Sequence, residues 1–135
     1  MVEIEIAYEG ELHTHARHGP SRADLATDAP RDNEGRGEAF SPTDLVAVAL
    51  GSCMLTVMGI LARRKGWLLD GAQARVEKHM VADPVRRIGR LAVQFSMPVG
   101  LPEEARGPLE RAAHTCPVHE SLHPAVEVDV CFDWA

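Results

Sequence analysis

The stretch SPTDLVAVALGSCMLTVMGILARRKG, residues 41–66, decides the fold of this chain. Eighteen residues from Leu45 to Ala62 carry no charge. Ser41 is a typical N-cap, and Pro42 suits the first helical position, which needs no N–H. Asp44 lies where a carboxylate completes a capping box, and Gly66 follows three basic residues, as is usual after a helix end. The pattern predicts one long helix that is apolar on all sides.

A helix of this composition needs cover on every side. Its length also reaches the threshold for a transmembrane segment, but it is interrupted by small and polar residues and lacks an aromatic belt. We therefore expect a buried helix outside the membrane. A single small sheet covers only about half of such a helix, so the sequence favours a homodimer.

The 135 residues suffice for one domain, 1–135, with a real core. The net charge of -6 disfavours nucleic acid and anionic membranes as partners. The N-terminus lacks the features of a signal peptide, and three cysteines fit a reducing compartment. We expect a cytoplasmic protein without a disulfide framework.

Alternating or apolar segments predict strands on both sides of the long helix. A second helix is expected at 102–115, with a kink or break at Gly107-Pro108. This order favours an antiparallel α+β domain. The expected strands are 2–8, 12–17, 23–26, 72–81, 88–97 and 125–134.

Two cysteines carry the candidate chemistry. Cys53 follows Gly51-Ser52 in the long helix, where small neighbours would leave room for a substrate or a second sulfur. Cys116 ends the second expected helix before Pro117, in a turn that would make its thiol mobile. Both also fit the role of small core residues. Together they suggest an attacking thiolate that becomes a sulfenic acid and a second thiol that condenses with it.

Other residues in the chain suggest weaker alternatives. His114, Cys116, His119 and His123 have spacings that resemble a zinc site, but no second cysteine pair accompanies them. We expect neither a metal nor a cofactor. Cys131 shares a strand face with three acids, so we expect an unreactive, partly exposed thiol. His13 and His15 alternate along a strand, as surface histidines do.

Three segments resemble the OsmC/Ohr family of osmotically inducible and organic hydroperoxide resistance proteins. They are residues 37–45, Leu50-Gly51-Ser52-Cys53-Met54 and Cys116-Pro117-Val118-His119. The resemblance implies sheets wrapped around two central helices in an intertwined homodimer. It implies a peroxidatic Cys53, a resolving Cys116, organic hydroperoxide substrates and a dithiol reductant such as a lipoyl group.

One position departs from the family pattern. Peroxidase members carry a glutamate after the helix-opening proline, and it helps to hold an arginine over the thiolate. This chain has Thr43 there, although Glu38 and Asp44 lie nearby. We expect Arg17 to be the arginine, with Arg22 as the reserve. The departure keeps two alternatives open, namely a redox-sensing or thiol-exchange protein and a small-molecule-binding protein with little peroxidase activity.

Overall fold

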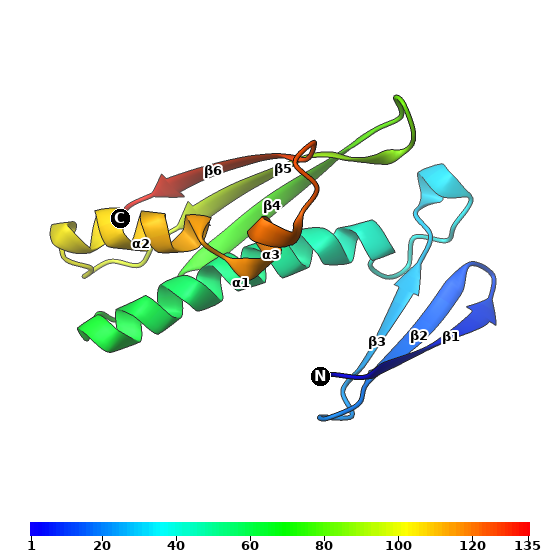
Figure 1. Ribbon diagram of the computed structural model, residues 1–135, viewed down its shortest axis with the longest axis horizontal. Helices are drawn as coiled ribbons and strands as arrows, with labels where there is room; N and C mark the ends of the chain where they lie inside the picture. The colour runs from blue at the N-terminus through cyan, green and yellow to red at the C-terminus, as the bar shows by residue number, and fades with distance from the viewer. The chain divides into compact units, whose positions relative to one another are not determined.

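The uncharged stretch forms one helix, α1 (Pro42–Lys65), in the computed structural model, which describes residues 1–135 (Figure 1). A capping box begins it. The Asp44 N–H donates to Ser41 Oγ at 3.0 Å, and the Ser41 N–H donates to the Asp44 carboxylate at 2.9 Å. Gly66 follows the last turn with a φ of 74°, a left-handed conformation that favours glycine. The predicted helix and both of its end signals are confirmed.

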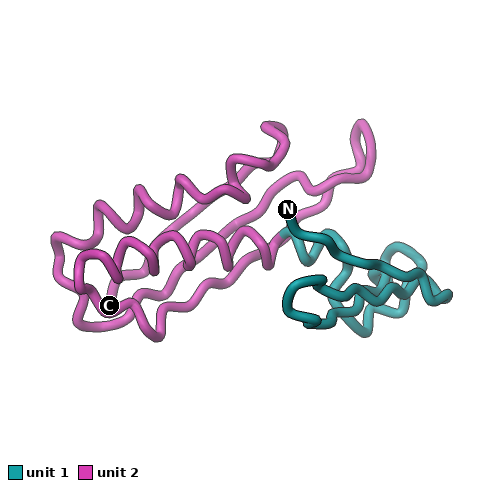
Figure 2. Tube along the Cα trace, turned by 60° about the horizontal axis from the view of Figure 1, so that its bottom comes forward, with its two compact units in different colours: residues 1–46 teal, residues 47–135 magenta.

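The chain divides into two compact units, which we call the N-terminal unit (1–46) and the C-terminal unit (47–135) (Figure 2). The N-terminal unit holds an antiparallel three-stranded sheet in the order β1-β2-β3. A short 3₁₀ turn, η1 (Arg31–Asn33), lies between this sheet and α1. The strands are β1 (Ile4–Gly10), β2 (His13–His18) and β3 (Asp24–Asp28).

The C-terminal unit holds a second three-stranded sheet, in the order β4-β5-β6. Strands β4 (Gln73–Val81) and β5 (Arg87–Ser96) form the predicted antiparallel pair. Strand β6 (Glu127–Asp133) pairs with β5 in parallel, from Arg90↔Glu127 to Ser96↔Asp133. The expected α+β class is confirmed, and this one pairing departs from the antiparallel expectation. The reason is that helices connect β5 to β6, and parallel strands require such a crossover.

Those connecting helices differ from the single helix expected at 102–115. A 3₁₀ turn, η2 (Glu103–Ala105), leads directly into α2 (Arg106–His114). The change of helix type comes at Arg106, so Gly107 and Pro108 lie in the first turn of α2. A further short helix, α3 (Pro117–Ser121), was not predicted.

The core of the C-terminal unit lies between α1, the sheet and α2. Fully buried side chains come from each of these elements: Leu50, Met54, Met58, Leu91, Phe95 and Leu109. Gly51 faces strand β4, where an added Cβ would come within 3.0 Å of the Val76 side chain. Its small size therefore lets helix and sheet approach closely. This contact does not test the expectation that Gly51-Ser52 leaves room beside the Cys53 thiol, which stays a prediction.

The rest of α1 is not covered within the C-terminal unit. Val48 and Ile60 are 43% and 46% exposed, and Ala49, Ser52 and Thr56 are exposed beside them. By length and mean hydropathy α1 could cross a membrane. Of its most apolar 18-residue segment, 33% is buried. In the N-terminal unit one face of β1 is also uncovered, with Ile6 and Tyr8 each 68% exposed.

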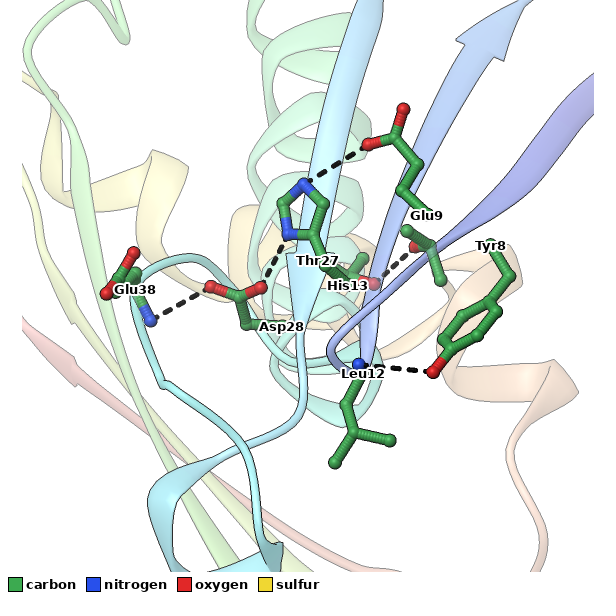
Figure 3. Close-up of polar contacts among 8 residues, drawn as sticks. Tyr8, Glu9, Leu12, His13, Thr27, Asp28 and Glu38 are labelled. Carbon is green, nitrogen blue, oxygen red and sulfur yellow. Dashed lines mark hydrogen bonds and ion pairs between the residues drawn. The ribbon is translucent and has the colours of Figure 1, made fainter.

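Asp28 connects the N-terminal sheet to the loop that leads into α1 (Figure 3). Its side chain is almost fully buried and lies 2.5 Å from His13 Nδ1. The same carboxylate accepts the Glu38 N–H at 3.1 Å, while His13 Nε2 lies 3.5 Å from Glu9. The hydrogen bond from His13 holds the pKa of Asp28 below its ordinary value.

This network predicts a pH dependence of stability. A carboxylate whose pKa is lowered by folding stabilises the fold above its unfolded pKa of about 3.9, and this stabilisation is lost as the pH falls through the folded pKa. Asp28→Asn should therefore lower the free energy of unfolding at pH 7 and flatten its decline in acid. Urea titrations between pH 2 and pH 7, with the exposed-site variant Asp133→Asn as control, measure this. Parallel curves for wild type and Asp28→Asn would contradict the assignment.

Candidate active site

Two thiols of the C-terminal unit come from different elements. Cys53 lies in the middle of α1 and is half-buried. Cys116 is fully buried and is the N-cap of α3, where Pro117 occupies the first helical position. The chain turns at Cys116 as expected, but Pro117 begins a further helix there and the thiol is fully buried, whereas the predicted mobility of the thiol stays a prediction.

The structure brings the Cys53 and Cys116 side chains together. Cys53 lies close enough to the Cys116 thiol to raise its pKa, although 63 residues separate them in the sequence. Both are free thiols. A helix thiol beside a buried second thiol is an arrangement in which one sulfur can be oxidised and the other can condense with it.

The surroundings of Cys116 favour its protonated form. Burial is the main cause that raises the pKa of this thiol above its ordinary value, and the neighbouring Cys53 raises it further. The backbone N–H groups of His119 and Val118 lower the pKa of Cys116. The His119 nitrogen lies 3.2 Å from the Cys116 Sγ. Burial outweighs these N–H groups, so Cys116 is a thiol at neutral pH.

Arg17 belongs to the polar face of the N-terminal sheet. Its Nε donates to Asp24 Oδ1 at 2.8 Å, and His15 Nε2 lies 3.2 Å from the same oxygen. The hydrogen bond to Asp24 raises the pKa of Arg17, which therefore stays charged. A hollow of about 310 Å³ lies on this face, lined by Glu5, Ile6, Ala7, His15 and Arg17. Sequence reasoning missed Asp24, whose alignment with Arg17 depends on the register of β2 and β3.

The helix start holds no glutamate beside the proline. Thr43 Oγ1 lies 3.2 Å from Ser41 Oγ, and Asp44 is part of the capping box. Glu38 donates its backbone N–H to Asp28. Arg22, the reserve arginine, adopts a φ of 65° just before β3. Asp24 is thus the carboxylate that the structure pairs with Arg17.

The remaining candidates separate clearly. No group of three or more His, Cys, Asp or Glu side chains is arranged to hold a metal ion, so the zinc alternative gains no support. Cys131 is exposed on β6, on the same face as Asp129 and Asp133. His119 has a fully buried Nδ1 without a hydrogen-bond partner, a feature that sequence reasoning did not single out.

Comparison with known proteins identifies the family. The model of the family described as "OsmC-like protein" matches residues 35–130. The chain belongs to the OsmC-like family. A comparison with curated protein sequences gives no significant match.

Solved structures of similar proteins agree with this assignment. A Psychrobacter arcticus 273-4 protein, provisionally named an osmotic stress induced and detoxification response protein, is 41% identical. The similarity covers 98% of this chain and 96% of that one, with a TM-score of 0.93. The organic hydroperoxide resistance protein OsmC of Legionella pneumophila is 20% identical over 98% and 96% of the two chains, with a TM-score of 0.79. The organic hydroperoxide resistance protein OhrB of Bacillus subtilis is 17% identical over 98% of each chain, with a TM-score of 0.72. These last two show the OsmC-like fold alone.

Proposed function

We propose that this OsmC-like protein is a thiol-dependent peroxidase that reduces organic hydroperoxides. The observation that carries the proposal is the pairing of half-buried Cys53 with buried Cys116. Membership of the OsmC-like family supports a peroxide-related redox role, and the family includes organic hydroperoxide resistance proteins. Cys53 attacks the peroxide and Cys116 resolves the oxidised sulfur.

The proposed cycle uses the two protein thiols, one organic hydroperoxide and one reducing dithiol. The Cys53 thiolate attacks a peroxide oxygen, so that an S–O bond forms, the O–O bond breaks and an alkoxide leaves. The alkoxide takes up the proton that the thiol released when it ionised and becomes the alcohol. Cys116 then condenses with the resulting sulfenic acid to form a disulfide and water. A small dithiol such as a lipoyl group reduces this disulfide by two exchange steps. Such a cycle requires a reducing compartment, which supports a cytoplasmic location.

Consumption of cumene hydroperoxide and hydrogen peroxide, with dihydrolipoamide as the reductant, tests the proposal. We expect faster turnover of the organic peroxide. Consumption of neither peroxide above the protein-free rate would contradict a peroxidase. Thr43 in place of a glutamate favours a second candidate, a thiol-exchange protein. Reversible formation of the Cys53–Cys116 disulfide from a disulfide reagent, without peroxide turnover, would identify that function.

The uncovered apolar surfaces support a homodimer as the working form. The exposed face of α1 and the exposed face of β1 would each keep large uncharged side chains in water without a second copy. Burial of a Leu-sized side chain contributes about 1.5–3 kcal/mol, so covering several gives substantial stabilisation. We expect sedimentation at micromolar concentration to give a dimer. A monomer at that concentration would contradict this assembly and reopen the membrane alternative.

Arg17 is proposed as the cation that favours the Cys53 thiolate, with Asp24 holding its guanidinium. Arg17→Ala should slow the first oxidation of Cys53 about tenfold, a loss of about 1.4 kcal/mol of transition-state stabilisation. The difference should shrink above the free-thiol pKa of about 8.5, where no cation is needed. Stopped-flow rates against pH measure it, with Arg22→Ala as the matched control. A larger loss in Arg22→Ala would transfer the role to that residue.

A further inference from the structure

His119 has a polar atom for which the fold supplies no partner. The residue lies in the first turn of α3 and is half-buried as a whole. Its Nδ1, however, is fully buried and makes no hydrogen bond. An unpaired buried polar group destabilises a folded protein, so such an atom calls for an explanation.

The position of His119 suggests what that atom does. Its backbone N–H donates to Cys116 Sγ at 3.2 Å, so the histidine and the buried thiol share one turn. The other titratable groups at this turn are Cys53 from α1, the exposed His114 from α2 and the exposed Glu120 on α3 itself. The His114 and His119 ring centroids lie 6.5 Å apart. Of the two imidazoles, only that of His119 belongs to the turn that holds Cys116.

We propose that His119 accepts the proton of the Cys116 thiol when Cys116 attacks the oxidised Cys53. The inference rests on the proposed two-thiol function and adds a residue to it. As the S–S bond forms, the S–O bond of the Cys53 sulfenic acid breaks and hydroxide leaves. The thiol proton moves to the imidazole and then to that hydroxide, so water is released and His119 is neutral again. Cys116 is oxidised, and the Cys53 sulfenic acid is reduced to the disulfide.

The need for a proton acceptor follows from the burial of Cys116. The thiol is fully buried, and burial raises its pKa, so little thiolate exists at neutral pH. Because the thiolate is the nucleophile, the second step is slow unless a nearby group removes the proton. A positioned base contributes roughly 10²–10⁴-fold to such a step.

The first test separates the two steps in a Cys131→Ser background, which removes the exposed thiol. One equivalent of cumene hydroperoxide is added, and quenched samples are analysed by mass spectrometry. In His119→Gln we expect the Cys53 sulfenic acid to form at the wild-type rate and the disulfide to form about 100-fold more slowly. His114→Gln is the matched control and should leave both rates unchanged. Equal slowing of both steps in His119→Gln would overturn the proposal.

A pH profile distinguishes a base from a structural residue. The wild-type rate of disulfide formation should level off at a pH below that at which the Cys116 thiol itself ionises, because the imidazole then removes the proton. In His119→Gln the rate should keep rising until the thiol itself ionises. A variant profile that runs parallel to that of the wild type would mean a purely structural role and would overturn the proposal.

A second arm requires no peroxide. Ellman's reagent places a thionitrobenzoate on Cys53, and attack by Cys116 releases it with a change in absorbance. We expect release to be about 100-fold slower in His119→Gln and unchanged in His114→Gln. Wild-type rates in His119→Gln would refute the base role. If release is slow in His119→Gln but the wild type does not react with peroxide, the proposed peroxidase function is refuted and the role of His119 as a base is supported.

Discussion

Cys53→Ser is expected to abolish hydroperoxide reduction, with a loss of at least about 10³-fold, since removal of an enzyme's nucleophile has effects of this size or more. A serine hydroxyl at this half-buried position keeps the shape of α1 but cannot form a sulfenic acid. The fold should be unaffected, because Cys53 is outside the fully buried core. Steady-state consumption of cumene hydroperoxide measures the loss, and circular dichroism checks the fold.

Cys116→Ser is the matched variant and should behave differently. Its Cys53 should react once with peroxide and then stall as a sulfenic acid, because no second sulfur condenses with it. Mass spectrometry after one equivalent of peroxide identifies the oxidised residue. A sulfenic acid on Cys116 of the wild type would reverse the two roles. Turnover at the wild-type rate in both serine variants would exclude the two-thiol mechanism.

Features that depend on neighbours in the sequence could be predicted. The limits of α1 follow from Ser41, Asp44 and Gly66, which act within one helical turn of each end. The alternation of β6 likewise places Cys131 on the exposed face. These signals are local, so they need no knowledge of the tertiary structure.

Features that depend on pairing or burial could not be predicted. The parallel alignment of β6 with β5 is a tertiary choice, and both strands would look the same in an antiparallel pair. The dipeptide Cys116-Pro117 reads equally as a helix end and as the N-cap and first residue of another helix. Gly51 has no side chain, and only the position of Val76 shows that this lets α1 approach β4 closely.

The candidate site shows the same division. The two cysteines could be named from their residue types and from the family resemblance. The carboxylate that pairs with Arg17 could not be named, because Asp24 reaches Arg17 across a strand pair. The buried Nδ1 of His119 is a consequence of packing that no spacing rule expresses.

The largest loss of stability is expected from Phe95→Ala. Phe95 on β5 is fully buried, and its ring stacks on that of Phe132 with centroids 5.0 Å apart. Phe132 stacks in turn on Trp134 at 5.8 Å, and the Trp134 Nε1–H donates to Glu110 of α2 at 3.0 Å. This aromatic row connects β5, β6 and α2, so a cavity at Phe95 would loosen the packing of all three elements.

Truncation of a buried phenylalanine costs about 3–5 kcal/mol, from lost apolar burial and the cavity that remains. A domain of this size has about 5–15 kcal/mol of stability in total, so Phe95→Ala should lose a large part of it. Urea unfolding at a fixed protomer concentration measures the change. Val99→Ala, at a position 80% exposed, should stay within about 0.5 kcal/mol of the wild type. A loss below about 1.5 kcal/mol for Phe95→Ala would mean that β6 and α2 close the cavity, and that the aromatic row is not what holds them on β5.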